Sequence, residues 1–204
     1  MALRRVVEVR RRLAVCFDVP FNAGPVRYEP IRWTLWAGCY PGHDNDSFRE
    51  SMSILRSFGV NRMVDLTEED ELTTAGEKVW SYHARLTVLA SPILQRPVVR
   101  SERFAVRDDC APGNRVAVGV CRAIDEAVRA GERTYLHCRG GVGRTATMVA
   151  AYLLWSGLAG ERDVLGVLDR MRRYESRPAP MPAQVDWLFG VWIPYVKRMR
   201  RKER

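Results

Sequence analysis

The clearest indication of the fold comes from residues 133–154, RTYLHCRGGVGRTATMVAAYLL. This stretch begins with a short apolar run, RTYLHC, which predicts a buried strand. It ends in a nearly all-apolar run that continues to Gly157 and predicts a helix buried on most sides. A cysteine, three glycines and an arginine therefore lie in a tight connection between a strand and the N-terminus of a helix.

The segments before this stretch also alternate between strands and helices. IRWTLWAGCYPG predicts an entry strand that ends in turn residues, and VNRMVDLT predicts a buried strand. EEDELTTAGEK follows the second strand as a loop or a short helix. NDSFRESMSILRSFGV predicts a helix with Asp46 or Ser47 as the N-cap and Gly59 as its stop. RVAVGVCRAIDEAVRAG has apolar residues at helical spacing and ends at Gly131, which predicts another helix.

Two further helices are predicted after residue 157. RDVLGVLDRMRRY places Val164, Leu165, Leu168 and Met171 on one face. The last helix starts at Pro182 and can bend at Pro194. Strands that alternate with helices predict an α/β fold with a central, mostly parallel sheet of about four to five strands, flanked by helices.

The length predicts a single domain with extensions. A chain of 204 residues with 47% apolar residues can bury one sizeable core. We expect an N-terminal basic extension over 1–25, one folded domain over 26–195 and a basic C-terminal tail over 196–204. No run is long and apolar enough to predict a membrane span or a secretory signal, so we expect a cytoplasmic protein. The five cysteines show neither a C-x-x-C pair nor zinc-ligand spacing, which favours reduced thiols and no metal.

The charge of the chain favours anionic partners. The net charge is +9, and much of it lies in the N-terminal segment MALRRVVEVRRRLAV and in the C-terminal KRMRRKER. An anionic membrane surface could bind these basic ends, while a solvated tail is the simpler interpretation. Since neither a nucleic-acid-binding signature nor interleaved aromatic residues accompany them, we expect no nucleic-acid partner.

Three phosphate-binding motifs compete for the glycine-rich turn. A Walker A loop requires a lysine before its Ser or Thr, and Arg144 stands at that place. The run from Gly141 to Ala146 matches G-x-G-x-x-A, with Glu161 about twenty residues later. However, Glu161 opens a predicted helix rather than ending a strand, and about sixty residues are too few to complete a dinucleotide-binding fold.

The third motif is an anion-binding nest, and it accounts for every residue in the turn. Backbone N–H groups at the helix N-terminus converge on one point, where they can bind a phosphate and stabilise a thiolate at Cys138. Gly140, Gly141 and Gly143 permit the tight turn. Arg144 can bind two phosphoryl oxygens, and Thr145 can donate its hydroxyl to the sulfur. The predicted phosphate-binding residues are Arg139, Gly140, Gly141, Val142, Gly143 and Arg144.

HCRGGVGRT resembles the signature of the cysteine-dependent protein tyrosine and dual-specificity phosphatases. The resemblance extends over roughly Trp33 to Trp192 and is similar to the compact, bacterial-type members. It implies that Cys138 is the nucleophile, that Arg144 binds the phosphoryl group and that His137 orders the loop. It also implies catalysis through a cysteinyl-phosphate without a metal or an organic cofactor.

The resemblance implies a general acid about thirty residues before the cysteine, on a loop that ends in proline. RFAVRDDCAP has this layout, and its distance to Pro112 selects Asp108 over Asp109. Two solvated carboxylates are the alternative. Related enzymes orient the hydrolytic water with a glutamine, for which Gln184 is the candidate, although a plain surface glutamine fits the sequence equally well.

The substrate stays open among three hypotheses. The first is a protein tyrosine or dual-specificity phosphatase, because the chain is too short for the insertions that deepen the cleft of classical tyrosine phosphatases. The second is a phosphatase for a phosphoinositide or another small phosphate ester. Lipid-directed relatives carry basic residues at the first and fourth loop positions, which here are Arg139 and Val142. The third is a phosphate-recognising binding module without turnover.

Overall fold

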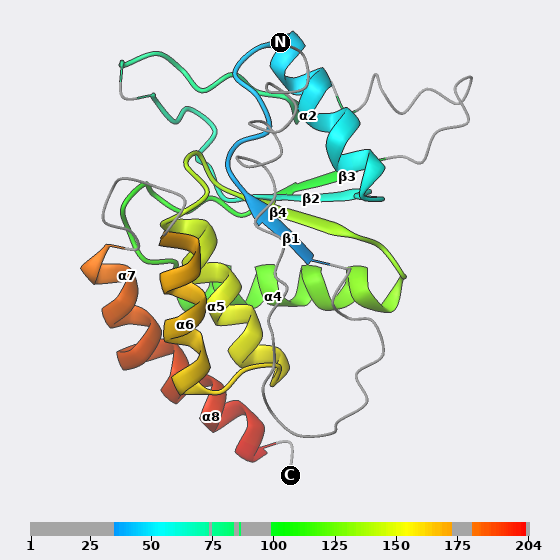
Figure 1. Ribbon diagram of the computed structural model, residues 1–204. Coiled ribbons are helices and arrows are strands. Elements are labelled where there is room, and N and C mark those ends of the chain that lie inside the picture. The colour runs from blue at the N-terminus through cyan, green and yellow to red at the C-terminus, as the bar shows by residue number, and fades with distance from the viewer. Residues whose placement is uncertain (1–34, 74, 84–85, 87–98, 173–180, 203–204) are drawn as a thin grey trace.

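Four parallel strands form the centre of the molecule (Figure 1). The computed structural model describes residues 35–73, 75–83, 86, 99–172 and 181–202. In this part of the chain the strands are β1 (Leu35–Gly38), β2 (Arg62–Asp65), β3 (Arg100–Arg103) and β4 (Thr134–His137), in the order β1-β4-β2-β3. Every strand pair is parallel, which confirms the predicted sheet.

Helices cover both faces of this sheet. One face packs against α2 (Asn45–Ser57), and the other packs against α4 (Asn114–Arg129) and α5 (Arg144–Ser156). Figure 1 shows α6 (Glu161–Arg172) and the C-terminal helices on the same side as α4 and α5. The α/β fold predicted from the alternating pattern is therefore confirmed.

Strands β1, β2 and β4 are largely buried on both faces, whereas the edge strand β3 (RSER) is exposed or only partly buried. Successive side chains of a strand point to opposite faces. Ala37, Val64 and Leu136 consequently join the core under α4 and α5. Their predecessors in the chain, Trp36, Met63 and Tyr135, join the core under α2.

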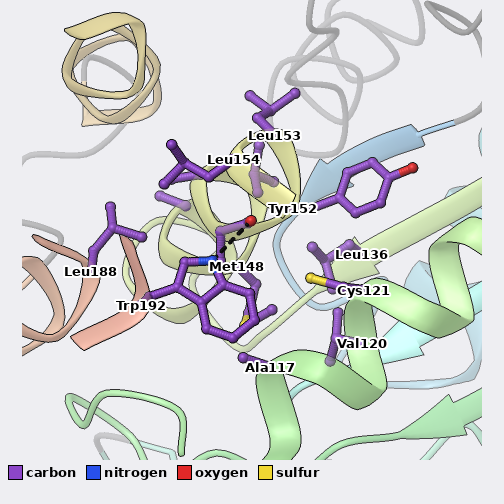
Figure 2. Close-up of a cluster of buried hydrophobic side chains, with 14 of the residues drawn as sticks. Ala117, Val120, Cys121, Leu136, Met148, Tyr152, Leu153, Leu154, Leu188 and Trp192 are labelled. Carbon is purple, nitrogen blue, oxygen red and sulfur yellow. Dashed lines mark hydrogen bonds between the residues drawn. The ribbon is translucent and has the colours of Figure 1, made fainter. Parts of the chain in front are cut away.

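Helix α5 lies at the centre of the larger core. All of its residues from Arg144 to Leu154 are buried, as expected for its nearly all-apolar sequence. Trp192 packs beside Met148 with no exposed surface, and its indole N–H donates a hydrogen bond to the Ala151 carbonyl at 3.0 Å (Figure 2). The helix ends at Gly157, whose φ of 77° is a left-handed cap conformation that favours glycine.

The C-terminal helical segment changes its hydrogen-bond pattern before Pro194. Helix α7 (Pro182–Trp187) continues into a π-helical turn, η3 (Leu188–Trp192), and then into α8 (Ile193–Lys202). The Ile193 N–H reaches the Leu188 carbonyl, five residues earlier. Proline has no N–H and clashes with a regular helical turn, so the wider turn accommodates Pro194 where the sequence predicts a bend.

Three local features differ from the sequence predictions. The N-cap of α2 is Asp44, whose carboxylate accepts the Ser47 N–H at 2.7 Å, because the chain enters the helix two to three residues earlier than predicted. Leu165 is 51% exposed, so the buried stripe of α6 includes Val164 and Leu168 but not Leu165. The strand before the predicted acid loop is RSER, β3, rather than RFAV.

The ends of the chain relate differently to the predicted boundaries. Residues 1–25, the predicted basic extension, lie outside the described residues. The predicted tail from residue 196 is helical as far as Lys202, within α8. The domain boundaries stay a prediction. No helix in the described part of the chain is long and apolar enough to cross a membrane.

Candidate active site

The candidate site lies at the carboxyl ends of the four strands. Gly38, His137, Asp65 and Arg103 stand side by side in the sheet register as the last residues of β1, β4, β2 and β3. The loops that follow these strands therefore begin next to one another. Ligand sites of parallel α/β sheets form at this edge.

The loop after β4 curls around the sulfur of Cys138. Only 3% of Cys138 is exposed, and its Sγ accepts the Gly141 N–H at 3.2 Å. Gly141 has a φ of 79°, and a Cβ at this position would lie 2.5 Å from the Cys39 backbone nitrogen. The close approach of the loop to the end of β1 thus requires glycine at position 141.

Arg144, the first residue of α5, is held end-on by a buried carboxylate. Its Nη1 and Nη2 donate to the two oxygens of Glu71, each at 2.6 Å. Nη1 also donates to the carbonyls of Val106 at 2.9 Å and Leu66 at 3.3 Å. Although burial opposes its charge, the hydrogen bonds to Glu71 raise the pKa of Arg144 above its usual value. The guanidinium is therefore a fixed cation.

The other edge of the same guanidinium has a different environment. The Arg144 Nε is buried and has no hydrogen-bond partner among the described residues. The Arg144 Nη2 lies 2.8 Å from Asp108 Oδ1. Because Nε and the outer hydrogen of Nη2 point in the same direction, this edge can bind two oxygens of one anion.

Asp108 reaches the site from the loop after β3. Its side chain is 34% exposed, and its second oxygen, Oδ2, lies 2.5 Å from the Nη2 of Arg139. The neighbouring carboxylate, Asp109, belongs to a residue with a φ of 58°, which is a turn conformation. The structure thus places Asp108 against both arginines of the glycine-rich loop.

His137 lies beneath the loop as a neutral ring. Its side chain is fully buried, and its Nε2 lies 2.7 Å from the Tyr82 hydroxyl. Burial lowers the pKa of His137 to about 4, so the ring is uncharged at neutral pH. This position beneath the loop is compatible with the loop-ordering role that the resemblance implies, and that role stays a prediction.

Asp65 is the buried anion beside His137. Burial favours its neutral form. The electrostatic interaction with His137 and the hydrogen bonds from His83 and Thr67 outweigh burial and hold the pKa of Asp65 well below its usual range. Its Oδ1 accepts the N–H of Thr67 at 2.8 Å and the hydroxyl of Thr67 at 2.7 Å. The carboxylate fixes the start of the loop that carries Glu71.

Thr145 and Gln184 occupy buried positions near the loop. The Thr145 hydroxyl points to the Gly38 carbonyl at 3.4 Å, rather than making a hydrogen bond to the sulfur. Gln184 is 1% exposed, and its Nε2 donates to the Cys110 carbonyl at 3.0 Å. A Cβ on Gly143 would lie 3.2 Å from the Gln184 Oε1. Gln184 is therefore not a plain surface residue, while its catalytic role stays a prediction.

Sequence reasoning missed Glu71, Tyr82 and Asp65 as parts of the site. EEDELTTAGEK offers several acidic side chains in one loop, and Glu71 alone of this set pairs with Arg144 in the described structure. The signal that could have placed this loop at the site was its position directly after a buried strand. The sequence gives no way to choose which carboxylate turns inward.

Known proteins share this fold. Tk-PTP in its active form matches with a TM-score of 0.57 and 21% identity, over 79% of this chain and 92% of that one. PTPMT1 in complex with PI(5)P matches with a TM-score of 0.61 and 17% identity, over 84% and 96%. TpbA of P. aeruginosa in complex with pTyr matches with a TM-score of 0.58 and 16% identity, over 82% and 85%.

A family model identifies the relationship at the level of sequence. The family described as Tc-R-P, polymorphic toxin system, DSP-PTPase phosphatase, matches residues 38–158. The chain belongs to this family. It is therefore a cysteine-dependent phosphatase of the dual-specificity and protein tyrosine phosphatase class, as the resemblance implied.

The matched range contains most of this DSP-PTPase site. Glu71, Asp108, Cys138 and Arg144 all lie within residues 38–158, whereas Gln184 lies beyond it. Glu71, Arg144 and Asp108 are linked by the ion pairs described above. The family match and the geometry thus point to the same part of the chain.

Proposed function

We propose that this DSP-PTPase hydrolyses phosphomonoesters on proteins, taking phosphotyrosine and also phosphoserine or phosphothreonine. One observation carries the proposal: Arg144 has a buried Nε without a hydrogen-bond partner among the described residues, on a guanidinium whose end is fixed by Glu71. A buried N–H without an acceptor is unfavourable. A phosphoryl oxygen bound beside Cys138 would provide the missing acceptor.

The first step of the proposed reaction is an in-line displacement. The Cys138 thiolate attacks phosphorus, an S–P bond forms and the bond from phosphorus to the leaving oxygen breaks. Arg144 and the loop N–H groups hold the phosphoryl oxygens throughout. Asp108 gives its proton to the leaving oxygen, because an alkoxide or phenolate is a poor leaving group.

The second step releases phosphate. Water attacks the cysteinyl-phosphate, Asp108 accepts a proton from that water, and the S–P bond breaks to restore the thiolate. We assign the orientation of this water to Gln184, which hydrogen-bonds the acid loop through the Cys110 carbonyl. We assign assistance to the leaving sulfur to Thr145, whose hydroxyl must rotate away from Gly38 for this role. No step needs a metal or an organic cofactor.

The assay that tests this proposal compares para-nitrophenyl phosphate with phosphotyrosine and phosphoserine peptides, in EDTA and reductant. We expect turnover by the native protein, none by Cys138→Ser, and a larger loss with peptides than with the aryl ester for Asp108→Asn. A strict metal requirement, or unchanged activity of Cys138→Ser, would contradict the mechanism. A protein that binds phosphopeptides but releases no phosphate even in a single turnover would be a binding module.

Phosphoinositides are the second candidate substrate class. PTPMT1, one of the similar structures, was solved with PI(5)P, whereas TpbA was solved with pTyr. The basic residue Arg139 at the first loop position supports the lipid alternative, and Val142 at the fourth position does not. A phosphoinositide turned over at least ten times faster than the phosphotyrosine peptide would establish this alternative.

We propose that the reaction takes place in the cytoplasm. An anionic membrane surface would contact the protein through exposed basic residues. In α8 the Arg200 Nη2 donates to the Leu154 carbonyl at 2.5 Å, and Lys197 pairs with Glu161. Arg198, Arg201 and Lys202 are exposed. Retention of the protein by phosphatidylserine vesicles, lost at high salt, would support this contact.

A further inference from the structure

Arg139 joins three loops at the edge of the site. It belongs to the glycine-rich loop, and 21% of its side chain is exposed. Its Nη1 donates to the Leu72 carbonyl at 2.5 Å, its Nε lies 3.7 Å from Glu71 Oε1, and its Nη2 lies 2.5 Å from Asp108 Oδ2. The guanidinium is thus oriented by the loop after β2 and holds the loop after β3.

The two oxygens of Asp108 are held by different arginines. Oδ1 lies against Arg144, and Oδ2 lies against Arg139. The Arg144 contact uses the same edge of the guanidinium that a phosphate would occupy. A substrate phosphate and the Asp108 carboxylate are both negative. They cannot share this edge of Arg144 without a proton between them. Substrate binding therefore weakens one of the two contacts and leaves the other in place.

We propose that Arg139 is the positioning residue of the general acid rather than a ligand of the substrate phosphate. This inference rests on the proposed function. Arg139 keeps Oδ2 in place when phosphate takes over Arg144, so that Oδ1 faces the leaving oxygen with its proton. The acid loop then stays closed over the phosphate loop during the step in which the proton is transferred.

The shape of the guanidinium explains why arginine suits this position. Its donors point in fixed directions in one plane, toward Leu72 on one side and Asp108 on another. A lysine has a single ammonium group and can satisfy one of these partners well, but not both in the same geometry. Arg139→Lys is therefore expected to keep only part of the effect.

The test separates positioning of the acid from binding of the phosphate. It measures kcat and KM of the native protein, Arg139→Ala, Arg139→Lys, Asp108→Asn and the double variant Arg139→Ala/Asp108→Asn. The substrates are para-nitrophenyl phosphate, whose leaving group is good, and phenyl phosphate, whose leaving group is poor. Arg107→Ala is the matched control, since Arg107 is exposed on the same loop as Asp108.

Positioning of the acid predicts a loss that depends on the leaving group. We expect Arg139→Ala to lower kcat about 100-fold with phenyl phosphate and less than about 10-fold with the nitrophenyl ester, with KM nearly unchanged. Arg139→Lys should show the same pattern with a smaller loss. In the Asp108→Asn background, removal of Arg139 should cost about 2-fold or less, because the acid that it positions is already absent.

Other outcomes overturn the inference. Equal losses with both esters, a large rise in KM, or losses that multiply in the double variant would make Arg139 a substrate ligand. If Arg139→Ala does not fold, the same comparison with Arg139→Lys decides. A native protein that turns over neither ester, with the Arg107→Ala control equally inactive, would overturn the proposed function itself and this inference with it.

Discussion

The substitution Glu71→Gln isolates the buried ion pair beneath the candidate phosphate site. Glu71 is 4% exposed at its side chain, and its two oxygens accept from Nη1 and Nη2 of Arg144 at 2.6 Å. Glutamine has nearly the same shape but carries no charge. It keeps one oxygen acceptor and turns an NH₂ group toward a guanidinium that can only donate.

The structure sets the expected size of the effect. Removal of one partner of a buried ion pair costs about 3–5 kcal/mol, because the remaining charge has lost its compensation. Arg144 keeps the carbonyls of Val106 and Leu66 and the carboxylate of Asp108 as partners. We therefore expect a loss of about 3 kcal/mol in the free energy of unfolding, at the lower end of this range. We also expect kcat/KM to fall about 100-fold because the guanidinium loses its fixed orientation.

The assay combines urea unfolding at pH 7.5 with steady-state hydrolysis of para-nitrophenyl phosphate. Glu69→Gln is the control, since Glu69 is exposed in the same loop and loses the same charge. We expect the control to stay within about 0.5 kcal/mol of the native protein. If Glu71→Gln also stays within that limit and keeps full activity, the ion pair does not support the site and the reasoning is refuted.

Three further predictions concern the loop and the core. Since the pKa of His137 is about 4 in the fold and about 6.5 in an unfolded chain, only the unfolded state gains a proton as pH falls from 7.5 to 5. Over this pH range the free energy of unfolding of the native protein should therefore fall by about 2 kcal/mol more than that of His137→Gln, as measured by urea unfolding. Equal decreases would contradict the buried neutral ring. Gly141→Ala should destabilise the fold by about 2 kcal/mol or more, because its φ is 79° and the new Cβ would meet the Cys39 backbone at 2.5 Å. Gly140→Ala, where a Cβ meets nothing within 4 Å, should change stability by less than about 1 kcal/mol, and similar effects of the two substitutions would refute the argument. Trp192→Ala should cost about 3–5 kcal/mol in thermal or urea unfolding, since Trp192 is fully buried and bonded to a core carbonyl, whereas Val191→Ala at a 43% exposed site should cost less than about 1 kcal/mol.

Much of the fold could be predicted because its signals are local. Strands β1, β2 and β4 are largely buried, so apolar runs bounded by turn residues mark them, whereas the edge strand β3 (RSER) carries no such signal. The N-cap at Asp44 and the exposure of Leu165 could not be predicted in the same way. Several polar residues near residue 44 are competent caps, and only the path of the chain into α2 selects one of them.

The order of residues alone was sufficient to predict how the glycine-rich loop places its side chains. Cys138, the glycines and Arg144 lie within seven consecutive residues, so a strand followed by a helix is sufficient to place them around one point. The geometry of this loop is short-range, and the order of residues specifies it directly. Asp108 was selected by the resemblance, through its distance to Pro112, and its role as the acid stays a prediction.

How the loops meet depends on the pairing of the strands. The parallel register places the ends of β1, β4, β2 and β3 in one row, and this brings Glu71 to Arg144 and Asp108 to Arg139. Glu71 and Arg144 are 73 residues apart in the chain. No local pattern distinguishes Glu71 from the acidic residues beside it, because its partner is chosen by strand pairing and burial rather than by sequence spacing.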